Sequence, residues 1–244
     1  MGADDVVISP EDGSCLRGWW LTSGARGPVA LIIHGWGGSA ADMIPVADPL
    51  RRLGLHVLLL DARGHGRSDD VAVASMPSFA ADVRAGVRWL RARPEVDRPG
   101  IVLVGHSVGA GACLFAASDD PDLAAVIALA SMADPRVFMG RQLRRFLPGS
   151  LTGLALRYVE HTIGYRFEQF VPVCTIQRIQ TPVLLLHGTQ DATVPVADAH
   201  HLHALGPTTT LEVIEDADHF SVEALDRAEP VVARFLAGCL RQPA

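Results

Sequence analysis

The chain has 244 residues, of which 49% are hydrophobic, and it carries a formal net charge of −6. This size and apolar content are enough for one large domain with a sizeable core. The net negative charge predicts no basic face of the kind that nucleic-acid-binding domains present. We therefore expect no nucleic-acid partner. All apolar runs are too short for a membrane span, so we expect no transmembrane segment either.

The cysteines and the N-terminal residues bear on the cellular compartment. Cys15, Cys113, Cys174 and Cys239 are widely separated and form no Cys-x-x-Cys pair. Such scatter predicts free thiols rather than a disulfide framework or a metal site. The first residues, Met1-Gly-Ala-Asp-Asp-Val-Val, are acidic and lack the basic and apolar regions of a secretory signal. We therefore expect a cytoplasmic protein.

Strands and helices alternate along most of the chain. An N-terminal hairpin is predicted from residues 6–9 and 15–22. Further strands are predicted at residues 28–34, 56–60, 101–104, 124–130, 182–187 and 209–214. Helices are predicted at residues 40–53, around 79–90, and at 110–117, 196–205 and 231–240. This alternation is typical of a mostly parallel sheet covered by helices on both faces.

The helix around residues 79–90 has a clear amphipathic pattern. Phe79, Val83, Val87 and Leu90 recur at helical spacing and predict its buried face. Charged residues, Asp82 among them, are expected to point away from that face.

The alternation is interrupted at residues 132–180, where two helices are predicted, at 141–148 and 151–163, and no strand. The sequence therefore predicts a core domain of residues 1–131 and 181–244 and a helical cap of residues 132–180. An ordinary helical excursion packed on the sheet is the alternative. Large apolar residues of this segment, Phe138 and Met139 among them, suggest contact with a hydrophobic substrate, although they could equally pack the cap's own core.

Gly105-His-Ser-Val-Gly109 lies between a predicted buried strand and a predicted small-residue helix. The two glycines leave room for a tight turn that lifts the Ser107 hydroxyl clear of the sheet. The helix N-terminus beneath it favours developing negative charge. This context predicts that Ser107 is a nucleophile, and the alternative is a glycine-rich turn with an incidental serine.

A serine nucleophile needs a base, and the base needs an acid that orients it. Active sites of open α/β sheets collect at the carboxyl ends of the strands. Asp191 and His219 each follow such a strand, so we expect Asp191 to orient His219 and His219 to deprotonate Ser107. Asp134 is the rival acid, but Asp134-Pro135 is also typical of a helix N-cap with proline at the first helical position.

The chain resembles the α/β-hydrolase superfamily, in its serine esterase or lipase-like branch with a small helical lid. Five stretches carry the resemblance: His34-Gly-Trp-Gly-Gly38, Asp61-Ala-Arg-Gly-His-Gly-Arg-Ser68, Gly105-His-Ser-Val-Gly109, His187-Gly-Thr-Gln-Asp191-Ala-Thr-Val-Pro195 and Asp218-His219-Phe220. The resemblance covers nearly the whole chain. It implies an α/β-hydrolase fold, with a mostly parallel eight-stranded sheet flanked by helices and a lid after the sixth strand. It also implies a Ser-His-Asp triad.

The backbone N–H groups of Val108 and Trp36 are expected to form the oxyanion hole, because one follows the nucleophile and the other lies in the early glycine-rich loop. The Trp36 indole is expected to form a wall of the acyl pocket. His106 is interpreted as structural, and His34 and His187 are expected to brace loops at the ends of their strands.

A serine nucleophile with an oxyanion hole favours hydrolysis of small carboxylic esters with short-to-medium hydrophobic acyl groups, through an acyl-enzyme. A thioesterase, a peptidase-like acyl hydrolase and a non-catalytic ligand-binding member of the same fold remain alternatives. His200, His201 and His203 cluster on one predicted helix, but no carboxylate or cysteine set completes a metal site. The sequence predicts no metal and no cofactor, and it leaves the oligomeric state open.

Overall fold

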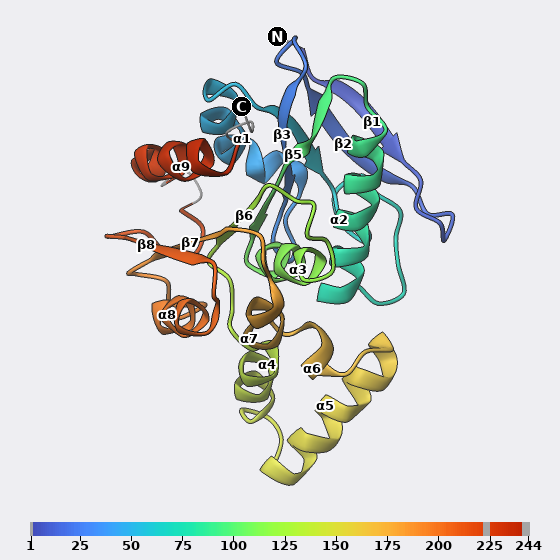
Figure 1. Cartoon of the computed structure of the whole chain (residues 1–244). Coiled ribbons are helices and arrows are strands. Elements are labelled where there is room, and N and C mark those ends of the chain that lie inside the picture. Colours follow the sequence, from blue (N-terminus) through green and yellow to red (C-terminus); the bar gives the residue numbers. More distant parts are fainter. Residues whose placement is uncertain (1, 222–224, 241–244) are drawn as a thin grey trace.

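An eight-stranded sheet forms the centre of the computed structural model, which describes residues 2–221 and 225–240 (Figure 1). The strands lie in the order β1-β2-β4-β3-β5-β6-β7-β8. Their bounds are β1 (Asp4–Ile8), β2 (Leu16–Leu21), β3 (Gly27–Ile33), β4 (His56–Leu60), β5 (Val96–His106), β6 (Ala125–Leu129), β7 (Val183–Gly188) and β8 (Thr209–Ile214). The pairs β1–β2 and β2–β4 are antiparallel, and all other pairs are parallel. The predicted fold, an eight-stranded and mostly parallel sheet, is confirmed.

Helices cover both faces of the sheet and produce two apolar clusters. The flanking helices are α1 (Ile44–Arg52), α2 (Met76–Arg91), α3 (Val108–Ala117), α8 (Val196–Leu205) and α9 (Leu225–Cys239), and a 3₁₀ turn, η1 (Ala40–Met43), precedes α1. Side chains of α2, α3 and α8 pack in one cluster, and those of α1 and α9 pack in the other. Neighbouring residues of β3, such as Leu31 and Ile32, enter opposite clusters, because successive strand side chains alternate between faces.

Helix α2 confirms the amphipathic pattern but corrects one of its residues. Phe79, Val83 and Leu90 are fully buried, as predicted. Asp82, which we expected to point away from the core, is also fully buried. Its Oδ1 accepts a hydrogen bond of 2.7 Å from Nε of Arg63, and its Oδ2 accepts one of 2.9 Å from the Arg63 backbone N–H. A buried carboxylate requires such a partner, so this pair ties α2 to the loop after β4.

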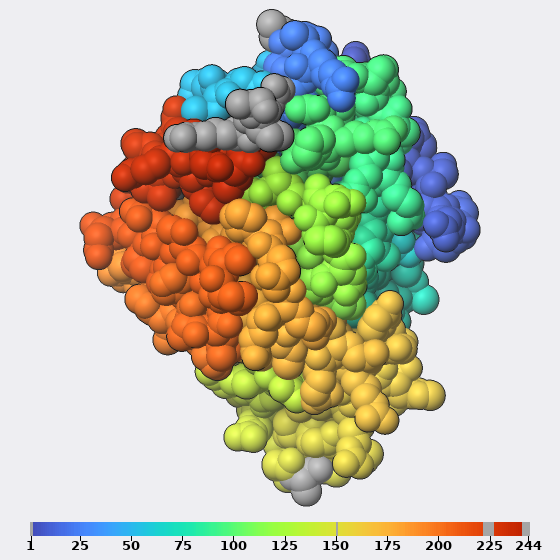
Figure 2. All heavy atoms as spheres, viewed as in Figure 1, coloured from blue at the N-terminus to red at the C-terminus, as the bar shows by residue number. Residues whose placement is uncertain are grey.

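The segment between β6 and β7 contains four short or medium helices and a 3₁₀ turn. They are α4 (Pro135–Leu143), α5 (Gly149–Ile163), α6 (Phe167–Phe170), α7 (Pro172–Thr175) and η2 (Ile176–Arg178). We call residues 135–178 the cap segment. Its helices α4, α5 and α6 lie together beyond one end of the sheet (Figure 1), and the segment forms a protrusion in Figure 2. The division of the chain into a core domain and a cap stays a prediction.

The helix expected at residues 141–148 is wrong, because α4 begins at Pro135 and ends at Leu143. The side chain of Asp134 accepts a hydrogen bond of 2.8 Å from the Arg136 N–H and caps this helix. Proline suits the first helical position because its missing N–H has no partner there in any case. The N-cap signal of Asp134-Pro135 therefore located the helix better than the apolar pattern did.

Among the described residues, no helix combines the length and the apolar character that crossing a membrane requires.

Candidate active site

Ser107 occupies the sharp turn between β5 and α3. Its φ of 54° and ψ of −115° lie in a region that residues other than glycine rarely adopt. A Cβ on Gly105 would overlap the backbone of Gly109, and a Cβ on Gly109 would overlap the carbonyl oxygen of His34. The two glycines of the Gly-x-Ser-x-Gly motif are therefore required for the helix to pack this closely against β3 and β5.

His219 joins Ser107 to Asp191 through two hydrogen bonds. Nε2 of His219 lies 3.0 Å from Oγ of Ser107, and its Nδ1 lies 2.7 Å from Oδ2 of Asp191. A carboxylate only accepts hydrogen bonds, so Nδ1 carries the proton and the lone pair of Nε2 faces the serine hydroxyl. Asp191 follows β7 and His219 follows β8, and all three side chains are buried. The structure thus brings together the three residues that the sequence predicted.

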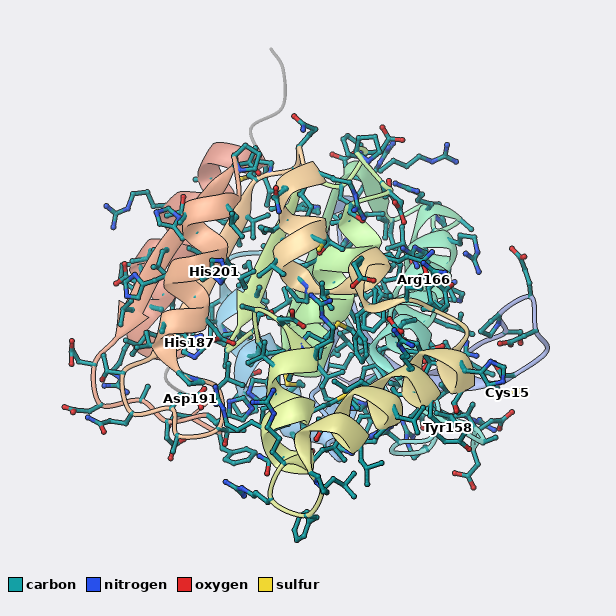
Figure 3. All side chains as sticks on the ribbon, turned by 90° about the horizontal axis from the view of Figure 1, so that it is seen from below. Cys15, Tyr158, Arg166, His187, Asp191 and His201 are labelled. Atoms are coloured by element: carbon teal, nitrogen blue, oxygen red, sulfur yellow. The ribbon has the colours of Figure 1, made fainter. Side chains whose placement is uncertain are left out.

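The surroundings of Asp191 keep its carboxyl group ionised. Burial alone would raise the pKa of Asp191, but hydrogen bonds from His187, His219 and the Val194 N–H hold it well below its ordinary value. Oδ1 accepts bonds of 2.9 and 2.7 Å from the N–H groups of Thr193 and Val194. Nε2 of His187 lies 3.4 Å from Oδ2, and Figure 3 shows the two residues side by side.

Asp134, the rival acid, lies elsewhere. Besides capping α4, its carboxylate forms an ion pair of 2.8 Å with the guanidinium of Arg136. The carboxylate that contacts His219 is that of Asp191. The geometry therefore favours Asp191 as the orienting acid.

His34 braces two loops, as its position at the end of β3 predicted. Its Nδ1–H donates a hydrogen bond of 2.7 Å to the carbonyl oxygen of Gly35, and its Nε2 accepts one of 3.0 Å from the Ala62 N–H. Burial lowers the pKa of His34, which favours the neutral ring that this pair of bonds requires. The ring therefore fixes the glycine-rich loop relative to the loop after β4.

His106 has a partner that sequence reasoning missed. Its Nε2 lies 2.7 Å from the backbone carbonyl oxygen of His219, to which it donates a hydrogen bond. Burial and the nearby imidazole of His219 lower the pKa of His106 to about 4. The ring is therefore neutral near pH 7 and acts as a hydrogen-bond donor to the loop that carries His219. No local signal announces this contact, because the two residues are far apart in sequence.

Two backbone N–H groups without partners flank Ser107. Val108 is the first residue of α3, and Trp36 follows Gly35 in the glycine-rich loop. Within the part of the chain that the structure describes, neither N–H donates a hydrogen bond. A Cβ on Gly35 would lie 3.2 Å from Cβ of Ser107, so this loop passes directly beside the serine. The arrangement fits the expected oxyanion hole.

Ser107 and His219 line a cavity of about 950 Å³ that lies between the sheet and the cap segment. Trp36, Phe138 and Met139, the expected substrate-binding residues, all line it. The indole of Trp36 packs on the ring of Phe79 but is 61% exposed, so it stands at the cavity's open side. The other walls are mainly apolar and include Met43, Met76, Met132, Val159, Phe170 and Phe220.

The topology and the position of Ser107 are those of α/β hydrolases, and comparison with known proteins agrees. The family model for the alpha/beta hydrolase fold matches residues 28–174. The uncharacterized protein Rv2307c of Mycobacterium tuberculosis is 31% identical over 227 residues, which are 91% of this chain and 74% of that protein. The chain therefore belongs to the alpha/beta hydrolase fold family, as its motifs predicted.

More distant relatives include proteins with named activities. The thermostable monoacylglycerol lipase of Bacillus sp. strain H-257 is 23% identical, over 85% of this chain and 88% of the lipase. The Pyrococcus furiosus esterase Pf2001 superposes with a TM-score of 0.78 at 24% identity, covering 98% of this chain and 91% of the esterase. Est1E of Butyrivibrio proteoclasticus, solved with ferulic acid, gives a TM-score of 0.77 at 20% identity, covering 97% and 100%. At these identities the structures establish the fold alone.

Proposed function

We propose that this protein is a serine hydrolase that cleaves carboxylic esters of short-to-medium hydrophobic acyl groups through an acyl-enzyme. The observation that carries the proposal is the hydrogen-bond chain from Asp191 through His219 to Ser107, which ends in an apolar cavity. Relatives named as esterases and as a monoacylglycerol lipase support a hydrolase.

Acylation begins when Oγ of Ser107 attacks the ester carbonyl carbon while Nε2 of His219 accepts its proton. The carbonyl oxygen becomes an oxyanion, which accepts hydrogen bonds from the N–H groups of Trp36 and Val108. The bond between the carbonyl carbon and the alcohol oxygen then breaks, and His219 delivers the proton to the departing alcohol. Asp191 holds the productive tautomer of His219 and stabilises the imidazolium.

Deacylation repeats these steps with water. His219 takes a proton from the water while its oxygen attacks the acyl carbon, and the tetrahedral intermediate again lies in the oxyanion hole. When this intermediate collapses, the bond to Ser107 Oγ breaks and His219 returns the proton to the serine. The carboxylic acid leaves and the free enzyme is restored.

The cavity supports a hydrophobic acyl group as substrate. Its volume lies in the upper part of the range of about 300–1,000 Å³ that small-molecule sites occupy. Phe138 and Met139 contribute apolar walls from α4. The one carboxylate that lines it among the described residues, Asp42, is engaged by hydrogen bonds from Ser39. Charged and peptide substrates are therefore expected to react poorly.

A panel of p-nitrophenyl esters and matched acyl thioesters tests this proposal. We expect a burst of p-nitrophenol stoichiometric with the protein, followed by continued turnover, and a higher kcat/KM for the esters. A burst without turnover would favour a ligand-binding member of the fold. Faster turnover of the thioesters would favour a thioesterase.

A further inference from the structure

Helix α5 is apolar on two opposite sides. On the inner side Leu156, Val159 and Ile163 pack against the core, and the latter two line the cavity. On the outer side Leu151, Leu154 and Tyr158 are 48%, 64% and 69% exposed. A surface helix normally presents polar residues to water, and a helix that is apolar all round is usually covered on every side.

The exposed residues form one continuous stripe. Positions 151, 154 and 158 follow the three- and four-residue spacing that places side chains on a single helix face. Phe146, in the turn before α5, is a further apolar residue of this region and is 85% exposed. We call Phe146, Leu151, Leu154 and Tyr158 the outer stripe. Figure 1 shows α5 at the end of the molecule farthest from the sheet, and Figure 3 looks onto this helix from outside.

The surroundings of the outer stripe are basic, whereas the net negative charge of the chain predicted no basic face. The cap segment contains seven arginines and two glutamates, whereas the net charge of the chain is −6. Arg144, Arg145 and Arg157 lie beside the stripe in sequence and are exposed. Within residues 2–221 and 225–240, none of these three forms an ion pair with a carboxylate. Their positive charge is therefore available to a partner.

We propose that the outer stripe and its arginines dock the protein on an anionic lipid surface. Apolar and aromatic side chains insert at the boundary between headgroups and acyl chains, and arginines bind the lipid phosphates. A second copy of the chain would bring two basic faces together, which like-charge repulsion opposes. Because the inner side of α5 lines the cavity, docking would leave only this helix between the cavity and a source of apolar molecules.

Flotation with lipid vesicles tests the proposal independently of catalysis. Phospholipids with ether-linked chains contain no carboxylic ester bond, so a carboxylic ester hydrolase would leave their vesicles intact. The vesicles are of ether-linked phosphatidylcholine alone and of equal parts ether-linked phosphatidylcholine and phosphatidylglycerol. We expect binding to the anionic vesicles, weaker binding at high salt, and little binding to the neutral ones. Arg144→Gln, Arg145→Gln and Arg157→Gln should each weaken binding about fivefold. The double variant Leu154→Ser/Tyr158→Ser should abolish it.

Matched substitutions outside the cap segment are the controls. Arg98→Gln removes an exposed arginine on β5, and Val7→Ser removes an exposed apolar residue on β1, which is 48% exposed. Neither should change binding. The proposal is overturned if the unaltered protein does not float with anionic vesicles, or if the controls lose as much binding as the stripe variants. It is also overturned if the protein dimerises without lipid and Leu154→Ser/Tyr158→Ser restores the monomer. Turnover of a soluble ester by these variants reports separately on the proposed function.

Discussion

The imidazole of His106 donates a hydrogen bond of 2.7 Å to the backbone carbonyl of His219, across a separation of 113 positions in sequence. His106 directly precedes Ser107. Two neighbouring residues therefore contact His219: Ser107 through the His219 imidazole, and His106 through the His219 backbone carbonyl. The two rings lie 4.9 Å apart, centroid to centroid. The distance between Ser107 and His219 therefore depends on His106 as well as on Asp191.

Substitution of His106 should reduce turnover by misplacing His219. His106→Leu removes the donor, and we expect kcat to fall about tenfold to a hundredfold with little change in KM, because a small misplacement of a catalytic group has a large effect. The amide of Gln can reach a similar position, so His106→Gln should recover most of the loss. Steady-state kinetics on p-nitrophenyl butyrate measure both variants. An equal loss of kcat in His106→Leu and in His106→Gln would argue against a role for the hydrogen bond.

His106 should also make the folded protein sensitive to acid. Burial, assisted by the nearby His219, lowers its pKa from 6.5 to about 4. Between these pH values the unfolded chain binds a proton that the folded protein does not, so acidification favours unfolding. Between pH 7 and pH 4 the free energy of unfolding should fall by about 3 kcal/mol more in the unaltered protein than in His106→Gln. Urea titrations of both proteins at several pH values measure this difference. If His106 were not responsible, the free energy of unfolding would fall by the same amount in both proteins between pH 7 and pH 4.

Asp191 and Asp134 should differ sharply when each is changed to asparagine. Asp191→Asn should lower kcat by about 10⁴, because an amide at this position favours the wrong tautomer of His219. Asp134→Asn should leave turnover and stability nearly unchanged, since asparagine is also a good helix N-cap. Steady-state kinetics measure kcat for both variants, and circular dichroism shows whether each variant is folded. The reverse ranking would assign the orienting role to Asp134.

Local chemistry explains why much of the fold and the candidate site could be predicted. Mostly apolar strand patterns end shortly before the turns that carry Ser107, Asp191 and His219, and parallel strands bring such turns to one edge. The structure brings these three residues together, while their catalytic roles stay predictions. The ion pair between Asp82 and Arg63 could not be predicted from the sequence. Helical periodicity shows that Asp82 is a charged residue in a helix, but it does not show that Arg63, in a distant loop, lies close enough to pair with it.

The remaining differences have a similar origin. The contact between His106 and His219 depends on how two distant loops meet, which no short pattern encodes. The start of α4 was signalled by Asp134-Pro135, but the apolar residues of the cap segment face the cavity, the core and the solvent. Their spacing therefore does not mark a single helix face, and it suggested a helix at residues 141–148 instead.

The acyl-chain preference should follow the apolar walls of the cavity. We expect kcat/KM to rise about threefold per carbon from acetyl to butyryl or hexanoyl esters, and to fall before about twelve carbons. Phe138→Ala should lower kcat/KM for hexanoyl esters about tenfold and leave acetyl esters nearly unchanged, because acetyl is too short to reach α4. Phe146→Ala removes an exposed ring outside the cavity and is the matched control. A preference for acetate over every longer ester would contradict this substrate assignment.

The most direct test of the central claim is the hydrolysis of p-nitrophenyl butyrate by Ser107→Ala, compared with the unaltered protein under the same conditions. The substitution removes only the hydroxyl oxygen that faces His219, so the fold should be retained in circular dichroism and thermal unfolding. We expect the rate to fall by about 10⁴–10⁶, together with the loss of the p-nitrophenol burst. Near-normal turnover by folded Ser107→Ala protein would contradict the serine mechanism.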